Sequence, residues 1–288
     1  HPQPAGQAAR AARARGAAAA RGAHVRLQRP AVPDARLPPL RPHRLASRRA
    51  IDSAKKTVKI AIYQFDQREV LEALQRAHER GVAVQVVLDR SHVYTSGTSH
   101  EGGPRKPRPM VVELVKSGFD IMLVHGQNRG IQHNKFLLVD DLFLETGSYN
   151  YTTQSEDDHF ESVLMTMEKA RVGLYRRYFK YLRDNGAAVD FDKLEEILNR
   201  TEAVPEADDV EPEAARRGGE TERDSKFPPP PTDAENPVML NGEAFPRAIF
   251  SPQGGIEEAV IRAIDAAKLS VEVAMFSFYS RPIAEAIK

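Results

Sequence analysis

The sequence predicts an α/β fold, a layered domain in which helices flank a mixed β-sheet, followed by the incomplete start of a second copy of that domain. Two observations predict the first domain. Short runs of alternating apolar residues suit strands, and stretches with apolar residues at helical spacing separate these runs. An internal repeat near the C-terminal end predicts the second copy.

Composition limits the kinds of protein that the chain can be. The 288 residues carry a net charge of +1, 41% of them are hydrophobic, and none is cysteine. This length allows one or two domains with cores of their own. The sequence has no run of about 18 apolar residues, so it predicts no membrane-spanning helix. The lack of cysteine excludes disulfides and thiolate metal sites. It suits a cytosolic and a secreted protein equally, so the localisation stays open.

Residues 1–50 differ in composition from the rest of the chain. They hold eleven arginines, no lysine and a single acid, Asp34. A basic segment of this kind is typical of proteins that bind nucleic acid or anionic lipid. Ala, Arg and Pro dominate it, however, and it has neither a sustained apolar period nor the apolar centre of a signal peptide. We therefore expect residues 1–50 to be a disordered or non-native segment that does not join the folded core.

The first domain is expected over residues 51–200. Alternating apolar residues predict a strand at 57–64, and helical spacing predicts a helix at 68–80 that ends at Gly81. The helix expected at 169–184 carries an aromatic stripe, which we expect to pack in the core. The remaining expected elements are strands at 82–88, 120–124, 135–139, 142–145 and 161–166, and a short helix at 111–117.

A linker and an internal repeat follow the first domain. Residues 201–237 are acidic, contain four consecutive prolines and lack apolar periodicity, which predicts a flexible linker. Residues 238–288 are expected to begin the second domain. Ile264–Ile287 aligns with Ile51–Leu74 without a gap at an offset of 213, with ten identities in 24 positions. The duplication predicts a strand at 270–277, since its apolar positions match those of the first copy. We expect this strand to be frayed, or to lean on the first lobe as a stray edge, because it has no neighbouring strand in its own lobe.

The segment HNKFLLVDDLFLETGSYN carries the chemistry of the first domain. It contains six polar or small residues at fixed spacing: His133, Lys135, Asp140, Gly147, Ser148 and Asn150. This pattern resembles the signature of the phospholipase D superfamily, His-x-Lys-x4-Asp followed by x6-Gly-Ser-x-Asn. If each residue type has a frequency of one in twenty, a chance match in this chain has odds on the order of 10⁻⁵.

These residue types suit a phosphate diester without reference to any family. Alternation along a strand would place His133 and Lys135 on one face, where an imidazole and an ammonium group form a site for an anion. Ser148 and Asn150 add hydroxyl and amide donors, which stabilise the charge that develops in a phosphoryl transition state. Gly147 allows the backbone to turn closely beside the phosphate.

The resemblance implies a mechanism and further residue roles. Members of the family use two motif copies that face each other across one cleft. One histidine attacks phosphorus and forms a phosphohistidine, and the other protonates the leaving oxygen and then activates water. It implies catalytic roles for His133, Lys135, Asn150 and Glu161, with Glu161 orienting an imidazole of the opposite lobe. It also implies that Asp140 holds structure through a salt bridge or turn contact.

No metal or other cofactor is expected, because lysine and amide donors neutralise the phosphate charge. His92, His100 and His125 are scattered among loop residues, so the sequence offers no competing cluster of metal ligands.

The offset of the repeat places a second catalytic histidine near position 346, beyond Lys288. We therefore expect a protein of the two-motif type, truncated before the second motif and inactive as this fragment. The second motif-bearing lobe would normally come from the same chain, and a homodimer is the alternative way to complete the site.

The expected substrate is a phosphodiester, with a phospholipid as the first choice. An endonuclease of the same superfamily is an alternative, because Tyr151 after Asn150 resembles the nuclease-like branch. Residues 51–288 are acidic overall, however, which weakens binding to a nucleic-acid backbone. A non-catalytic binding protein is the third hypothesis, because a single motif copy is present.

Overall fold

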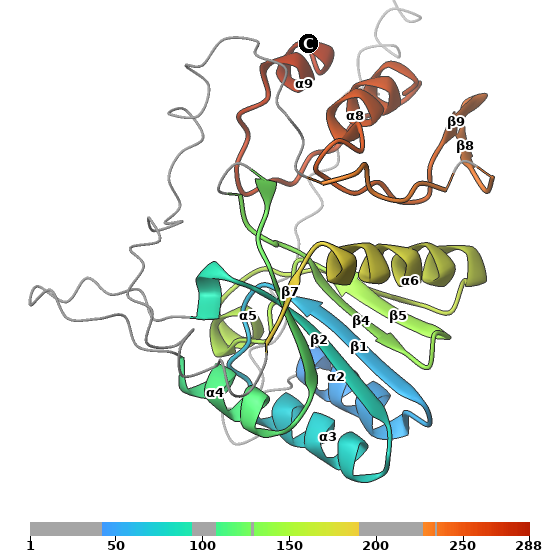
Figure 1. Cartoon of the computed structure of the whole chain (residues 1–288). Helices are drawn as coiled ribbons and strands as arrows, with labels where there is room; N and C mark the ends of the chain where they lie inside the picture. Colours follow the sequence, from blue (N-terminus) through green and yellow to red (C-terminus); the bar gives the residue numbers. More distant parts are fainter. Residues whose placement is uncertain (1–41, 94–107, 128–129, 190–226, 234) are drawn as a thin grey trace, which may run out of the picture. The chain divides into compact units, whose positions relative to one another are not determined.

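The computed structural model describes residues 42–93, 108–127, 130–189, 227–233 and 235–288. Its main feature is a seven-stranded mixed sheet (Figure 1) with the strand order β6-β5-β4-β1-β2-β3-β7. The strands β1, β2 and β3 are parallel to each other, and each of the other strands is antiparallel to its neighbour. The seven strands are β1 (Thr57–Ile62), β2 (Ala83–Asp89), β3 (Asp120–Val124), β4 (Lys135–Val139), β5 (Phe143–Gly147), β6 (Val163–Thr166) and β7 (Ala187–Ala188).

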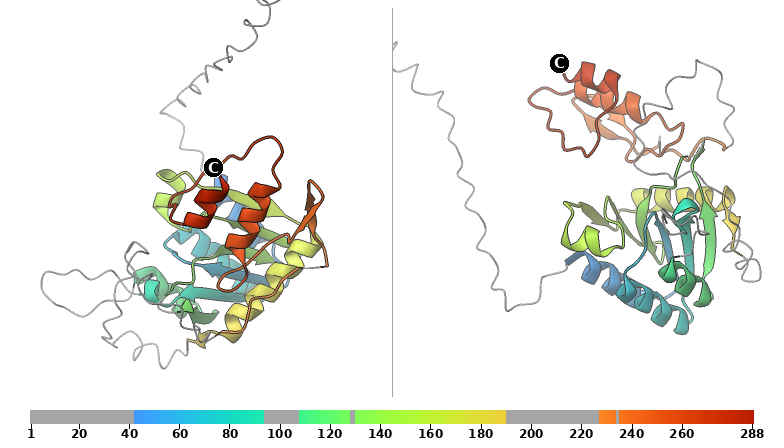
Figure 2. Two further views of the ribbon diagram at one scale, coloured as in Figure 1. Left: turned by 90° about the horizontal axis from the view of Figure 1, so that it is seen from above. Right: turned by 90° about the vertical axis from the view of Figure 1, so that its left-hand side faces the viewer.

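Helices cover both faces of the sheet. The helices α2 (Pro42–Ser53), α3 (Arg68–Glu79) and α4 (Pro109–Lys116) lie on one face, and α6 (Lys169–Asp184) lies on the other (Figure 1). The right-hand view of Figure 2 shows α2 and α3 side by side on the same face. Each face has its own apolar core. The aromatic stripe of α6 packs in the second core, so that prediction is confirmed.

The pleat of β4 explains how one strand serves both cores. Leu137 and Val139 belong to the core beneath α2 and α3, whereas Phe136 and Leu138 belong to the core beneath α6. All four side chains are buried, because β4 is central in the sheet and neither of its faces meets water.

Strand register brings distant parts of the chain to one edge of the sheet. Ile62 of β1 lies opposite Lys135 of β4, and Gly147 of β5 lies opposite Val163 of β6. Phe136 lies opposite Thr146, so Lys135 and Gly147 also face each other across the β4–β5 pair. This row places the residues that follow β1 and β5, and those that precede β4, at the same end of the sheet.

The expectation that residues 1–50 stay outside the folded core is wrong for residues 42–50, and residues 1–41 lie outside the described residues. Residues 42–50 belong to α2, which polar contacts fix in place. Ser47 is fully buried and donates to Glu145 Oε1 at 2.9 Å, and Arg44 pairs with Glu69 at 2.9 Å. Because polar side chains anchor this helix, it shows little of the apolar period on which the prediction relied.

The last part of the expected linker also makes contacts. Tyr181 of α6 donates to the carbonyl of Pro228 at 2.8 Å, and Arg177 donates to the carbonyl of Thr232 at 3.2 Å. Residues 227–233 therefore contact α6 and are no free tether. Of the rest of the predicted linker, residues 201–226 and 234 lie outside the described residues.

The segment expected to begin a second copy contains four short elements. They are β8 (Val238–Leu240), β9 (Glu243–Phe245), α8 (Ile256–Asp265) and α9 (Arg281–Ala286). The offset of 213 places α8 on residues 43–52, within α2, so a helix occupies the equivalent position in both segments of the predicted repeat.

The strand pattern at 270–277 forms no regular strand, as expected for a segment that has no neighbouring strand in its own lobe. The first copy shows why. Val58 and Ile60 of β1 are fully buried between two neighbouring strands, whereas the equivalent Val271 and Val273 are 43% and 54% exposed and pair with no strand in the described part of the chain. Among the described helices, none is long and apolar enough to cross a membrane.

Candidate active site

The candidate site lies at the end of the sheet where β1 and β2 finish and β4 begins. Lys135 is the first residue of β4, and His133 precedes the strand, so the prediction that both lie on one strand face is wrong. Two side-chain contacts replace ladder bonds here. Asp89 Oδ2 accepts from the Gln132 backbone at 2.6 Å, and Gln132 Oε1 accepts from the Asn134 backbone at 2.5 Å. The two predicted residues still adjoin, because Lys135 Nζ donates to the His133 carbonyl at 2.7 Å.

Tyr63 forms a wall of the site that the sequence analysis missed. Its ring centroid is 4.7 Å from that of His133 in an edge-on arrangement, and Lys135 Nζ lies 5.0 Å from it. On the same ring, His92 packs at 4.0 Å between centroids. A tyrosine face attracts a cation, so it helps to hold the Lys135 ammonium beside His133.

Burial sets the electrostatics of Lys135. Only 7% of the residue is exposed, and this burial lowers its pKa to about 8. Glu161 and Asp89 oppose that shift, because each negative charge favours the ammonium form. The negative charge of Glu161 thus affects Lys135 of its own lobe. Oε1 of Glu161 also lies 3.7 Å from Nδ1 of His159.

Asp89 is a buried carboxylate that ties three segments together. It follows the apolar run of β2 and accepts hydrogen bonds from the backbone N–H groups of Gln132 (2.6 Å), Ser91 (2.9 Å) and His92 (3.2 Å). Burial raises its pKa, while these hydrogen bonds favour the ionised form. The sequence feature that could have predicted a role for Asp89 is its position at the end of a parallel strand. Ligand sites of open α/β sheets lie at such strand ends.

Asn150 and Ser148 reach the same end of the sheet from β5. Asn150 Oδ1 accepts from the Gln64 backbone at 3.2 Å, and Asn150 Nδ2 donates to Gln64 Oε1 at 3.4 Å. Ser148 is exposed, and its Oγ accepts from the backbone of Ser162 at 3.0 Å. Gln64 is another residue that the sequence analysis missed.

Gly147 is needed for a different reason than the one predicted. A Cβ at this position would lie 1.9 Å from the carbonyl oxygen of Ser162, in the backbone that leads into β6. The close approach is therefore between neighbouring strands and requires glycine whether or not a phosphate is bound.

Asp140 lies at the opposite end of β4 from His133. It adopts the left-handed conformation with φ of 55° and accepts from the backbone N–H groups of Lys55 (2.9 Å), Lys56 (2.7 Å) and Thr57 (2.9 Å). Burial alone would raise the pKa of Asp140, but these donors outweigh it and the pKa is lowered. Its contacts are those of a residue that stabilises a turn between α2 and β1.

The three other histidines named in the sequence analysis do not lie together. His92 joins the site through Tyr63. His125 contacts its neighbour, with Nδ1 at 2.8 Å from the Gly126 carbonyl, and His100 lies outside the described residues. Within the described ranges, no group of three or more His, Asp or Glu side chains could hold a metal ion.

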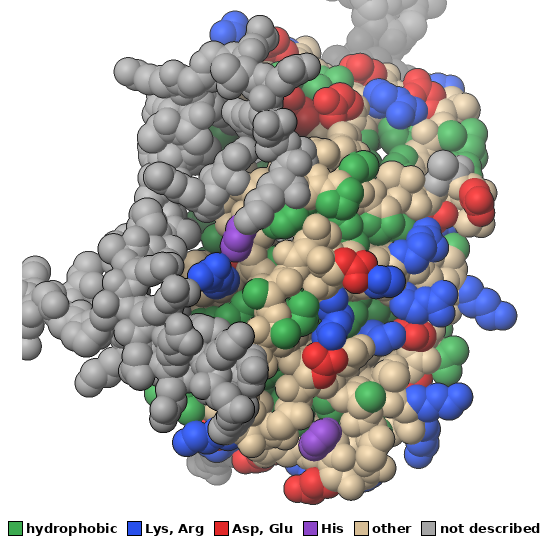
Figure 3. All heavy atoms as spheres, viewed as in Figure 1, with side chains coloured by type: hydrophobic (Ala, Val, Ile, Leu, Met, Phe, Trp, Pro, Cys, Tyr) green, Lys and Arg blue, Asp and Glu red, His purple; other side chains and the backbone are tan. Residues whose placement is uncertain are grey.

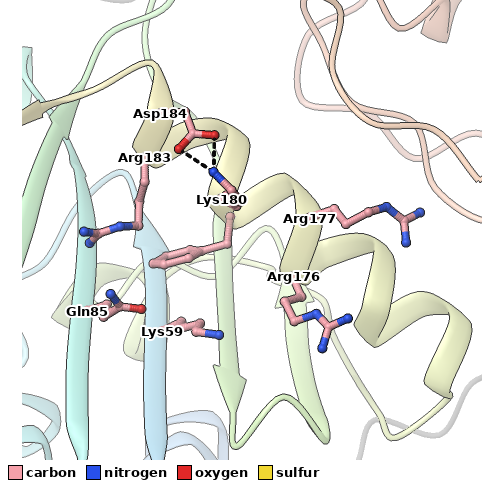
Figure 4. Close-up of a pocket in the computed structure, with 8 residues that line it drawn as sticks. Lys59, Gln85, Arg176, Arg177, Lys180, Arg183 and Asp184 are labelled. Carbon is pink, nitrogen blue, oxygen red and sulfur yellow. Dashed lines mark hydrogen bonds and ion pairs between the residues drawn. The ribbon is translucent and has the colours of Figure 1, made fainter.

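A basic pocket of about 420 Å³ lies elsewhere, between α6 and the beginnings of β1 and β2 (Figure 4). Three of its cations form ion pairs: Lys59 with Asp141, Lys180 with Asp184 and Arg183 with Asp120, at 2.7, 2.7 and 2.8 Å. Figure 3 likewise shows basic side chains next to acidic ones on the face it presents. We assign this pocket no ligand, because neighbouring carboxylates neutralise most of its charge.

Taken together, the fold and this site define a layered α/β protein whose imidazole, ammonium and amide groups gather at one end of a mixed sheet. Residues 48–183 match the family model described as "Cardiolipin synthase, PLD-like domain". Residues 48–183 therefore form a domain similar to those of the phospholipase D superfamily.

Curated relatives match over part of their length. The mitochondrial cardiolipin hydrolase of Homo sapiens is 31% identical over 132 residues, which cover 46% of this chain and 47% of that protein. A phospholipase D of Rickettsia conorii is 27% identical over 115 residues, 40% of this chain and 51% of that protein. This chain thus spans about half the length of these relatives. A solved structure of the phospholipase D family member Nuc from Salmonella typhimurium is 26% identical, covers 51% of this chain and 90% of that one, and has a TM-score of 0.43.

Proposed function

We propose that the protein is a phosphodiesterase of the phospholipase D type that hydrolyses a phospholipid through a phosphohistidine. One observation carries this proposal. The three motif residues His133, Lys135 and Asn150 lie at one end of the sheet, where they surround Tyr63 and Gln64. A nucleophile, a cation and an amide donor are the groups that phosphoryl transfer requires.

The reaction has two displacement steps. A ring nitrogen of His133 attacks phosphorus, and the bond to the leaving oxygen breaks. The Lys135 ammonium and the Asn150 amide stabilise the negative charge on the non-bridging oxygens. The leaving oxygen takes a proton from a second imidazole, which we assign to a second motif-bearing lobe. That imidazole then takes a proton from water, whose oxygen attacks phosphorus and releases His133.

The surroundings of Glu161 favour a lipid over a nucleic acid. Phe160 is fully exposed beside it, Leu164 and Met165 are exposed on the edge strand β6, and Met167 is exposed directly after that strand. Acyl chains at a membrane surface suit such an apolar rim, whereas a nucleic-acid backbone needs cations. The curated relatives are named cardiolipin hydrolase and phospholipase D, which supports the same substrate class.

Turnover of phosphatidylcholine and cardiolipin vesicles, compared with single-stranded DNA, tests the proposal in a polypeptide that carries both motif copies. We expect lipid hydrolysis that His133→Ala reduces by at least about a thousandfold, because the nucleophile is lost. His78→Ala is the matched control, since His78 lies on α3, away from the site, and packs there against Phe119. DNA cleavage without lipid hydrolysis would support the endonuclease instead. Lipid binding without turnover would support the non-catalytic protein.

A further inference from the structure

His92 has one hydrogen-bond partner whose chemistry fixes its tautomer. Its Nε2 lies 2.6 Å from Nε2 of Gln64. An amide NH₂ group can only donate, so the ring nitrogen must accept and the proton of a neutral imidazole must be on Nδ1. Burial lowers the pKa of His92 to about 4, and the positive charges of Arg108, His133 and Lys135 act in the same direction. His92 is therefore a neutral acceptor near pH 7.

The contact continues from Gln64 to Asn150. With its NH₂ group turned toward His92, Gln64 presents Oε1 to Nδ2 of Asn150 at 3.4 Å. The backbone N–H of Gln64 donates to Oδ1 of the same asparagine at 3.2 Å. Two contacts from one residue fix the plane of the Asn150 amide. These two contacts leave one N–H of the Asn150 side-chain amide unused.

His92 is itself held in place from two directions. Its backbone N–H donates to the buried carboxylate of Asp89 at 3.2 Å, and its ring packs on Tyr63 at 4.0 Å between centroids. Asp89 also accepts from the backbone of Gln132, next to His133, at 2.6 Å. The position of His92 is thus tied to the same anchor as the segment that carries His133.

We propose that His92 is a positioning residue of the phosphodiesterase site: its Nε2 accepts the Gln64 amide, and Gln64 in turn aims the Asn150 amide at the phosphate. This inference rests on the proposed function for its substrate and deepens it. A purely structural His92 would only fill space against Tyr63. The two possibilities differ in what they require of residue 92, an acceptor in the first case and a flat ring in the second.

Two substitutions separate these requirements in the whole 288-residue chain. His92→Phe keeps a flat ring on Tyr63 and removes the acceptor. His92→Gln loses the ring but keeps an acceptor oxygen near the place of Nε2. His78→Phe is the matched control. It likewise replaces a histidine that packs on an aromatic ring, here the ring of Phe119.

The first measurement follows the side-chain amide signals of Asn150 in ¹⁵N–¹H correlation spectra, assigned by their loss in Asn150→Ala. The second measures the dissociation constant for dimethyl phosphate, a diester anion that needs no turnover. We expect His92→Phe to shift and broaden the Asn150 signals and to weaken binding roughly fivefold, the worth of one hydrogen bond. His92→Gln should restore both, and His78→Phe should change neither.

A double-mutant cycle completes the test. In the Asn150→Ala background, His92→Phe should cause no further loss of affinity, because the amide that it positions is gone. Equal losses in both backgrounds would overturn the proposal, as would a failure of His92→Gln to restore affinity at unchanged thermal stability. If His92→Phe does not fold, Gln64→Met serves in its place, since it removes the linking amide from the other side. The Asn150 signals report on positioning even if no diester is hydrolysed, so the two proposals can fail separately.

Discussion

The charge of Lys135 depends on pH within the range in which proteins are assayed. Burial lowers its pKa to about 8, from an ordinary value of 10.5. Below pH 8 the ammonium can bind a diester anion, and above pH 8 it increasingly cannot. The same shift affects stability with the opposite trend. Between about pH 8 and 10.5 the unfolded state binds more protons than the folded state, so this group adds stability as pH rises.

We predict that the affinity for dimethyl phosphate falls about tenfold between pH 7 and pH 9.5, as the charge-assisted contact from Lys135 is lost. The probe keeps a single negative charge over this range, so the change reports on the protein. Titration calorimetry at several pH values measures it. Lys135→Arg is the control, since arginine stays charged and should flatten the profile. An equally steep profile in that variant would exclude Lys135 as its source.

At the scale of elements, Asp140 connects two turns that are far apart in the sequence. Its carboxylate accepts hydrogen bonds from three backbone N–H groups where α2 leads into β1. The residue itself lies in the turn between β4 and β5. Asp141 has nearly the same left-handed φ, 54° against 55°, but its carboxylate pairs with the side chain of Lys59. The two neighbours therefore differ mainly in whether they hold the backbone.

We predict that Asp140→Ala lowers the free energy of unfolding by about 1 kcal/mol more than Asp141→Ala does, because both lose aspartate at a left-handed position and only one frees backbone donors. Urea denaturation measures the difference. The effect should also depend on pH. The pKa of Asp140 is lowered in the folded state, so its contribution is present above the ordinary value of 3.8 and disappears as pH falls below it. Equal losses at neutral pH would show that the turn conformation, and not the backbone contacts, matters.

Glu145 is the buried carboxyl group that links β5 to α2. It accepts from Ser47 at 2.9 Å and from Tyr151 at 3.3 Å, and its Oε2 is buried without a hydrogen bond. Burial raises the pKa of Glu145 to about 7 despite these two donors. The folded state therefore binds more protons than the unfolded state between about pH 4.5 and 7, and stability falls as pH rises across this window.

We predict that Glu145→Gln removes this pH dependence and stabilises the protein at pH 8 by up to roughly 3 kcal/mol, because the amide still accepts from Ser47 and never carries a charge. Thermal unfolding at pH 5 and pH 8 measures it. Glu72→Gln, an exposed change on α3, is the control and should leave the slope as in the wild type. A variant that is less stable at both pH values would show that the ionised carboxylate is favourable in the fold.

The alternation and helical spacing of apolar residues predict most elements, because these patterns reflect which side chains are buried. They fail where an element depends on polar contacts or on a partner strand. The strands at Asp120–Val124 and Lys135–Val139 and the helix Lys169–Asp184 match the prediction. Residues 42–50 were missed because hydrogen bonds anchor α2. Residues 270–277 have the alternation of a strand but form none, because a strand needs a partner.

For the site, too, the sequence predicts some residues and not others. The motif itself predicts His133, Lys135 and Asn150, since they are close in the sequence. Asp89 and His92 meet them only through the sheet, because β2 and β4 both neighbour β1. Sequence spacing cannot show this, whereas the ends of predicted parallel strands would have been reasonable places to look.

At the scale of the whole molecule, the two segments of the predicted repeat differ in burial. The first copy buries its repeated apolar positions, such as Ile62 and Phe65. The equivalent Met275 and Phe278 are 65% and 43% exposed. Helix α8 has an apolar side yet no buried residue. An element of this size gains too little from burial to offset its conformational entropy, so its apolar side needs a further partner.

Our last prediction is that the 288-residue polypeptide, purified by itself, binds a diester anion but does not hydrolyse it. Hydrolysis through a phosphohistidine needs a second imidazole to protonate the leaving oxygen, and this sequence holds one copy of the motif. Two chains could supply it by bringing two copies of His133 together. We expect residues 227–288 to obstruct such a symmetric contact, because residues 227–233 contact α6 and the exposed apolar residues of the second copy favour irregular association. Light scattering and a diesterase assay on the same sample decide between these outcomes. A stable dimer with turnover, lost when wild-type chains are mixed with an excess of His133→Ala chains, would show that the site forms between two copies.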